Sequence, residues 1–132
     1  VRSQQERFTI SYLKLKLLKN KVSTEKNEKY NVAQNLKLKV LWLKNSLGLG
    51  IDQVNMKHQF PLTQYYFWPK TEAWEQLKSD LDSKPWLRKK EKINILNLSA
   101  DIMNYWRQRR NTESLEVVKN SFFEVDFIEL QN

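Results

Sequence analysis

"YYFWPKTEAW", residues 65–74, contains the transition that decides how this chain folds: four consecutive aromatic residues end at Pro69, and Trp74 follows. Exposed rings stack on nucleic-acid bases and buried rings fill a core, so the stretch allows both uses. Single-strand RNA platforms place rings at alternate positions of a sheet face. At most half of these consecutive rings can share one face, so the spacing favours a core or a protein interface.

The second half of the stretch predicts a helix over about 71–83. Proline is tolerated in the first turn, Thr71 can cap the helix, and Glu72 suits the positive end of the helix dipole. Pro85 disfavours helical geometry at the residue before it and so ends the helix. The apolar residues at helical spacing are Ala73, Trp74, Leu77 and Leu81. Trp74 is therefore predicted to be the first inward-facing anchor of this helix.

A longer helix is predicted over about 87–109. It is apolar over more than half of its circumference, whereas an ordinary surface helix needs a stripe of only ~100°. The remaining polar strip consists of Asn94, Asn97, Asp101, Asn104 and Gln108. The helix is either the central helix of the domain or packs against something besides its own sheet.

Alternation of apolar and polar residues predicts the strands. The clearest stretch is "LKLKVLWLK", residues 36–44, and weaker ones cover 8–17 and 123–127. Gly48 and Gly50 are expected to form a turn that leaves the first of these strands. The predicted fold class is α+β, with a small antiparallel sheet packed on two helices.

Length and composition set the broad class. A chain of 132 residues with 40% hydrophobic residues is long enough for one domain with a sizeable core. It has no cysteine, which excludes disulfides and thiolate chemistry, and its apolar runs stay well short of the ~20 residues of a membrane span.

The net charge of +8 is unevenly distributed. Residues 1–44 carry 11 Lys and Arg against 3 Asp and Glu, whereas residues 111–132 carry 1 against 5. This balance favours a polyanionic partner, although many basic domains are charged for solubility alone. Pairing of the acidic segment with strands near Lys14 and Lys37 would hide part of the basic surface.

Groups for catalysis or metal binding do not converge in the sequence. The single histidine, His58, lies in a polar segment and is expected to be an ordinary surface residue, and Asp80 and Asp82 lie among lysines at a helix end. We therefore predict no catalytic, metal or cofactor-binding residues, and no small-molecule substrate.

Basic residues gather at both ends of the long predicted helix. Those at its start oppose the helix dipole, which indicates either a bound anion or cations that extend into solvent. Those at its end suit the dipole and need no ligand. The two groups are ~30 Å apart along a helix, so they can touch only separate parts of a folded RNA.

Two segments resemble a known family. "LKVLWLKNSLGLGIDQ" (38–53) and the segment from Pro61 to Gln108, with Pro-Leu-Thr, Phe-Trp-Pro, Ala-Trp-Glu and Lys-Pro-Trp, resemble the plastid-specific ribosomal protein three family of chloroplasts and cyanobacteria. The resemblance covers about half of the chain. Residues 35–110 would then be the family core domain, residues 1–34 a basic extension with a strand and a mobile linker, and residues 111–132 an acidic tail with a strand.

The resemblance implies a non-catalytic structural constituent of the chloroplast small (30S) ribosomal subunit in the plastid stroma. Its implied partners are 16S-type ribosomal RNA and other small-subunit proteins, with no membrane. Charge placement, not a family motif, selects the phosphate-contact candidates: Lys14, Lys16, Lys19, Lys21, Lys37, Lys39, Arg88, Lys89, Lys90, Lys92, Arg107, Arg109 and Arg110. The alternative is a docking or regulatory module that associates with a complex without contacting RNA. A membrane-surface protein ranks last.

Overall fold

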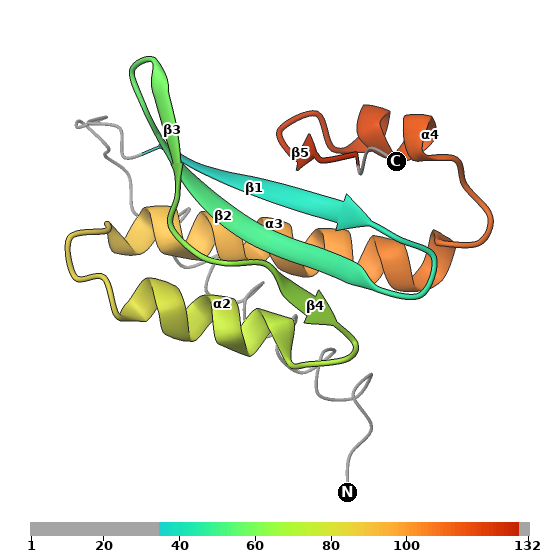
Figure 1. Ribbon diagram of the computed structural model, residues 1–132, viewed down its shortest axis with the longest axis horizontal. Coiled ribbons are helices and arrows are strands. Elements are labelled where there is room, and N and C mark those ends of the chain that lie inside the picture. Colours follow the sequence, from blue (N-terminus) through green and yellow to red (C-terminus); the bar gives the residue numbers. More distant parts are fainter. Residues whose placement is uncertain (1–34, 130–132) are drawn as a thin grey trace, which may run out of the picture.

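The computed structural model describes residues 35–129, and Figure 1 shows their arrangement. The chain begins with strands β1 (Asn35–Trp42) and β2 (Leu47–Asn55), followed by the short strands β3 (His58–Pro61) and β4 (Tyr66–Trp68). Helices α2 (Ala73–Asp82), α3 (Lys89–Arg109) and α4 (Leu115–Ser121) come next, and β5 (Asp126–Phe127) is last.

One sheet holds all five strands in the order β3-β2-β1-β5, with β4 on the same edge of β2 as β3 but at its other end. β1 and β2 pair antiparallel from Asn35 opposite Val54 to Trp42 opposite Leu47. β5 runs parallel to β1, with Lys39 opposite Asp126. The α+β class is confirmed, and the sheet is mixed, not purely antiparallel, because helices separate β5 from the other strands in the chain.

The core lies between the sheet and the helices α2 and α3, which lie side by side (Figure 1). Leu38 and Val40 of β1 and Leu49 and Ile51 of β2 are fully buried, as the alternation in β1 predicted. α3 packs against both the sheet and α2, so it is the central helix. The sheet and α2 together cover its broad apolar surface.

Both predicted helices are confirmed, each beginning two residues later than expected. The predicted cap at Thr71 is wrong, because the residue that precedes α2 is Glu72 and has no side-chain capping bond. The Thr71 hydroxyl instead donates to the carbonyl of Phe67 at 2.9 Å. Trp74 is buried and donates from its indole N–H to the Leu96 carbonyl at 3.1 Å, which confirms its anchoring role.

The predicted turn at Gly48 and Gly50 is wrong, since both glycines lie inside β2. A Cβ on Gly48 would lie 2.8 Å from the Phe67 ring, and one on Gly50 would lie 2.9 Å from Lys39 Cε. The side chains of Phe67 in β4 and Lys39 in β1 therefore lie over β2 at the two glycines, which have no side chains. The actual turn, at residues 43–46, is closed by a bond from the Leu43 N–H to the Ser46 carbonyl.

The polar strip of α3 differs from the prediction at Asn97. This side chain is only 2% exposed, and neither its amide nitrogen nor its oxygen has a hydrogen-bond partner. Helix α4 was not predicted, because Val118 is the only buried residue of this short helix. The predicted strand over 8–17 and the predicted linker over 20–34 lie outside the described residues.

Candidate nucleic-acid interface

Lys37 and Lys39 lie on the outer face of the sheet, opposite the helices, and both are engaged in ion pairs. Lys37 Nζ lies 3.5 Å from an Asp126 carboxylate oxygen, so the pairing between the acidic segment and Lys37 is confirmed. Lys39 Nζ lies 2.6 Å from Asp52 Oδ1, and the side chains of this pair are only 13% and 10% exposed. Little of Lys39 is left for a phosphate.

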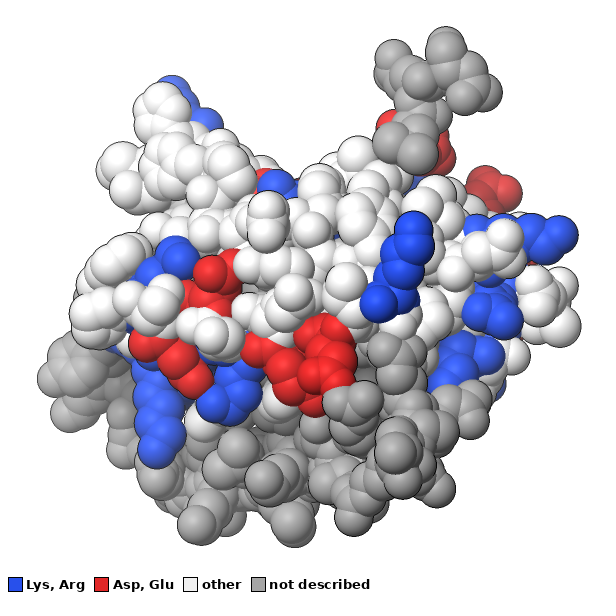
Figure 2. All heavy atoms as spheres, turned by 60° about the horizontal axis from the view of Figure 1, so that its bottom comes forward, with Lys and Arg blue, Asp and Glu red and all other residues white. Residues whose placement is uncertain are grey.

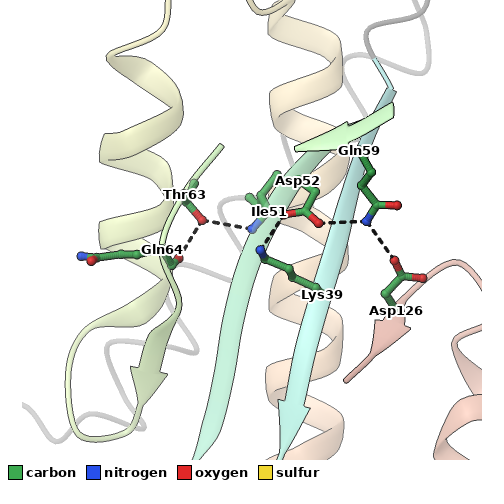
Figure 3. Close-up of polar contacts among 7 residues, drawn as sticks. All are labelled: Lys39, Ile51, Asp52, Gln59, Thr63, Gln64 and Asp126. Carbon is green, nitrogen blue, oxygen red and sulfur yellow. Dashed lines mark hydrogen bonds and ion pairs between the residues drawn. The ribbon is translucent and has the colours of Figure 1, made fainter. Parts of the chain in front are cut away.

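A line of polar contacts continues this pair across the sheet (Figure 3). Gln59 donates from Nε2 to Asp52 Oδ2 at 2.8 Å and to Asp126 Oδ2 at 3.3 Å. The Lys39 ammonium also lies over the Tyr65 ring, 4.9 Å from its centroid. Burial raises the pKa of the Tyr65 phenol, and the charge of Lys39 partly offsets this effect. The charged and polar side chains at these positions of the outer face are thus in contact with one another.

Thr63 supplies hydrogen bonds to Ile51 of β2, which lies between the part of β2 paired with β3 and the part paired with β4. Its hydroxyl accepts from the Ile51 N–H at 3.0 Å (Figure 3). The N–H groups of Leu62 and Thr63 both donate to the Ile51 carbonyl. Thr63 is buried, so these bonds have no competition from water. This is a structural reason for the Pro-Leu-Thr motif.

The basic group at the start of α3 consists of Arg88, Lys89, Lys90 and Lys92. Lys89 and Lys90 are exposed, and the other two are half-buried. Glu91 lies among them in the first helical turn, and its pKa is raised because burial outweighs the attraction of Arg88 and Lys90. These cations are brought together at the positive end of the helix dipole, where an anion is favoured.

The arginines at the end of α3 make contacts within the protein. Arg107 donates to the Asn104 side chain at 2.8 Å. The Arg109 guanidinium lies over the Tyr105 ring at 4.4 Å and pairs with Glu113 at 3.4 Å, and Arg110 lies over the Trp106 ring at 4.6 Å. These contacts orient the guanidinium groups while leaving all three side chains half-exposed.

Trp106 brings further cations to the same end of the molecule. Its indole N–H donates to the Leu43 carbonyl at 2.8 Å, and its ring packs against Trp68 at 5.6 Å. The exposed residues Lys44 and Lys70 follow these two partners in the chain. Sequence reasoning missed both, because only the contacts of Trp106 bring the turn after β1 and the end of β4 to the end of α3.

The described basic residues therefore form two separated groups. α3 has 21 residues, which separates its ends by about 30 Å. Figure 2 shows Lys and Arg side chains towards both ends of one face, with acidic side chains between and among them. Lys14, Lys16, Lys19 and Lys21 lie outside the described residues. The phosphate-contact assignments remain predictions.

Other kinds of site find little support in residues 35–129. In that range no group of three or more His, Asp or Glu side chains is placed to hold a metal ion, and no helix is long and apolar enough to cross a membrane. A surface hollow of about 350 Å³ has Glu91, Asp101 and Glu124 in its lining, and these carboxylates would repel phosphate. His58 is exposed in β3, as expected of a surface residue.

The described residues form a small α+β domain with two separated groups of basic side chains. Residues 62–109 match the family described as plastid and cyanobacterial ribosomal protein (PSRP-3 / Ycf65). Relatives match over larger parts of the chain. The chain belongs to this family, and the resemblance seen in the sequence is confirmed.

Three relatives illustrate the extent of the similarity. Small ribosomal subunit protein cS23 of Gracilaria tenuistipitata var. liui is 43% identical over 90 residues, which cover 68% of this chain and 91% of that protein. The protein of the same name from Euglena viridis is 37% identical over 97 residues, covering 72% and 96%. Small ribosomal subunit protein cS23z of Arabidopsis thaliana is 47% identical over 72 residues, covering 54% and 43%.

Proposed function

We propose that this chain is a structural, non-catalytic constituent of the chloroplast small ribosomal subunit, where it binds 16S-type ribosomal RNA and neighbouring ribosomal proteins. The observation that carries the proposal is membership of a plastid and cyanobacterial ribosomal protein family whose relatives are named small ribosomal subunit proteins. A small-molecule substrate and a membrane are not part of this function.

The charge distribution supports contact with RNA at separated points. The group at the start of α3 combines exposed Lys89 and Lys90 with the positive end of a helix dipole. The group at the other end combines Lys44 and Lys70 with the oriented arginines of α3. Two groups about 30 Å apart suit a folded RNA that passes both ends of the domain.

Co-sedimentation of the full chain with small ribosomal subunits tests the proposal at increasing salt concentration. Phosphate contacts release counterions, so the affinity should fall steeply as the logarithm of the salt concentration rises. Changing Arg88, Lys89 and Lys90 to Gln should weaken association and lower this slope. A flat salt dependence in the wild type would contradict phosphate contact as the main source of affinity.

The matched control removes two cations that the structure places in exposed ion pairs. Lys78 pairs with Asp82 at 2.7 Å and Lys119 with Glu129 at 3.0 Å. Changing both to Gln should leave association unchanged if the position of the charge matters, because these cations lie outside the two basic groups. An equal loss per charge removed, three in one variant and two in the other, would show that only net charge counts.

A protein-docking role without RNA contact is the second candidate. The segment around α4 and β5 exposes apolar side chains, with Phe123 86%, Val117 47% and Ile128 41% exposed. Such residues favour a protein partner over a phosphate surface. This candidate predicts that Phe123→Ser weakens association with subunits whereas the Gln variants at the start of α3 do not.

A further inference from the structure

The hairpin formed by β2 and β3 projects beyond the helices at one end of the sheet (Figure 1). Asn55 and His58 are its last paired residues, so Met56 and Lys57 form a two-residue turn. Every residue from Asn55 to Pro61 is exposed. We call Met56, Lys57, His58 and Phe60 the hairpin tip.

Met56 is poorly suited to its position on folding grounds. Its φ of 53° lies in the left-handed region, where two-residue turns favour Asn or Gly. A non-glycine residue there carries a cost in backbone strain. Its side chain is also 93% exposed, so no core packing offsets this cost. Backbone strain of this kind clusters at functional sites.

The rest of the tip combines planar rings with positive charge. The Phe60 side chain is 45% exposed, and its ring lies nearly parallel to that of His58, with centroids 6.5 Å apart. Lys57 is exposed in the turn, and residues 53–60 contain no Asp or Glu. Two carboxylates lie near the base of the hairpin and both are engaged, Asp52 by Lys39 and Gln59 and Asp126 by Lys37 and Gln59. The tip is therefore suited to bind an anion that also carries flat apolar groups.

We propose that the hairpin tip is an RNA-binding arm that inserts at an unpaired nucleotide of small-subunit ribosomal RNA. The Phe60 ring stacks on the base, Lys57 pairs with an adjacent phosphate, and Met56 packs against the exposed nucleotide. RNA fits better than an apolar protein groove, because such a groove would desolvate Lys57 without giving it a partner. The proposal rests on the proposed function and adds a site to it.

Binding of the full chain to small-subunit ribosomal RNA transcribed in vitro from a plastid sequence tests this arm. Phe60→Ala should weaken binding about tenfold with the salt slope unchanged, because stacking of one base is sequence-tolerant and involves no phosphate. Phe60→Tyr keeps the ring and should restore binding. Lys57→Gln should lower the salt slope by about 1, as expected for one lost phosphate contact.

The matched control is Lys78→Gln, which removes one exposed lysine outside the hairpin tip and the two basic groups and should leave RNA binding and its salt slope unchanged. Thermal unfolding of each variant shows that folding is retained. Wild-type affinity in Phe60→Ala would overturn the arm alone, as would a loss that appears only with whole subunits, since the tip would then contact protein. Absence of salt-dependent RNA binding in the wild type would overturn both the arm and RNA binding in the proposed function.

Discussion

Replacing Lys39 with methionine should destabilise the domain strongly, although Lys39 lies on the sheet face away from the core. Methionine keeps the stem that crosses Gly50 and removes the ammonium. The buried Asp52 side chain then loses its ionic partner and keeps the hydrogen bond from the Gln59 amide at 2.8 Å. A buried charge that loses its ionic partner is poorly compensated by one neutral hydrogen bond.

Geometry sets the size of the effect. The two side chains of the pair are 13% and 10% exposed and the charged atoms lie 2.6 Å apart. Breaking such a pair by removing one partner costs about 3–5 kcal/mol, and the bond from Gln59 favours the lower end, about 3 kcal/mol. Replacing both residues, as Lys39→Met with Asp52→Leu, should cost much less than the two single changes together, because no unpaired charge remains.

Urea denaturation measures these free energies of unfolding. The control is Lys78→Met, since the Lys78–Asp82 pair has nearly the same separation, 2.7 Å, but side chains that are 48% and 50% exposed. An exposed pair contributes at most about 1 kcal/mol. The difference between the two variants therefore measures what the enclosed setting of Lys39 adds, including its contact with the Tyr65 ring.

A loss of stability in Lys39→Met no larger than that in Lys78→Met would show that the Lys39–Asp52 pair contributes no more than an exposed pair. If Lys39→Met left stability intact and weakened RNA binding with a lower salt slope, Lys39 would be a phosphate contact, as its charge alone suggests. We expect the reverse: reduced stability, and an unchanged salt slope for the fraction that is folded.

Three further predictions concern the helices. Trp74→Ala should lower the free energy of unfolding by about 3–5 kcal/mol in urea titrations, and Trp74→Phe by less, since it removes chiefly the bond to Leu96. Asn97→Leu should raise it by about 1 kcal/mol, because it removes a buried amide without partners; a loss instead would show that the amide is bonded. Glu91 has a pKa raised by burial above 4.5, so its favourable contribution is complete below that pH and is lost as the pH rises through the folded-state value. Glu91→Gln should remove this loss in stability measurements across that range.

Local patterns were sufficient for the elements whose burial follows their own periodicity. The alternation in β1 placed Leu38 and Val40 inward, and the spacing of Trp74 and Leu77 gave the buried face of α2. The spacing of these residues within their own strand or helix is enough to place them on its buried face. The class of fold followed, because few arrangements bury one helix-rich half and one strand-rich half together.

Features that depend on contacts between distant segments could not be predicted from the sequence. Gly48 and Gly50 indicate a turn in the sequence, because the sequence does not show that the side chains of Phe67 and Lys39 cross over β2 at these positions. The sequence likewise does not show that neighbouring residues bury Asn97. Lys44 and Lys70 join the arginines of α3 only through the two contacts of Trp106. In the candidate interface, charge alone could not distinguish the enclosed Lys39 from the exposed Lys89.

The pairing of β1 with β5 has a consequence for how the chain matures. Synthesis delivers β1 well before Asp126 and Phe127, so Lys39 and Val40 of β1 must wait for these partners. Until then its outer edge carries open N–H and C=O groups that any extended chain could join. A chain that ended before residue 126 would lose the pairing at Lys39 and Val40. β5 thus covers a central part of the β1 edge against pairing with other chains.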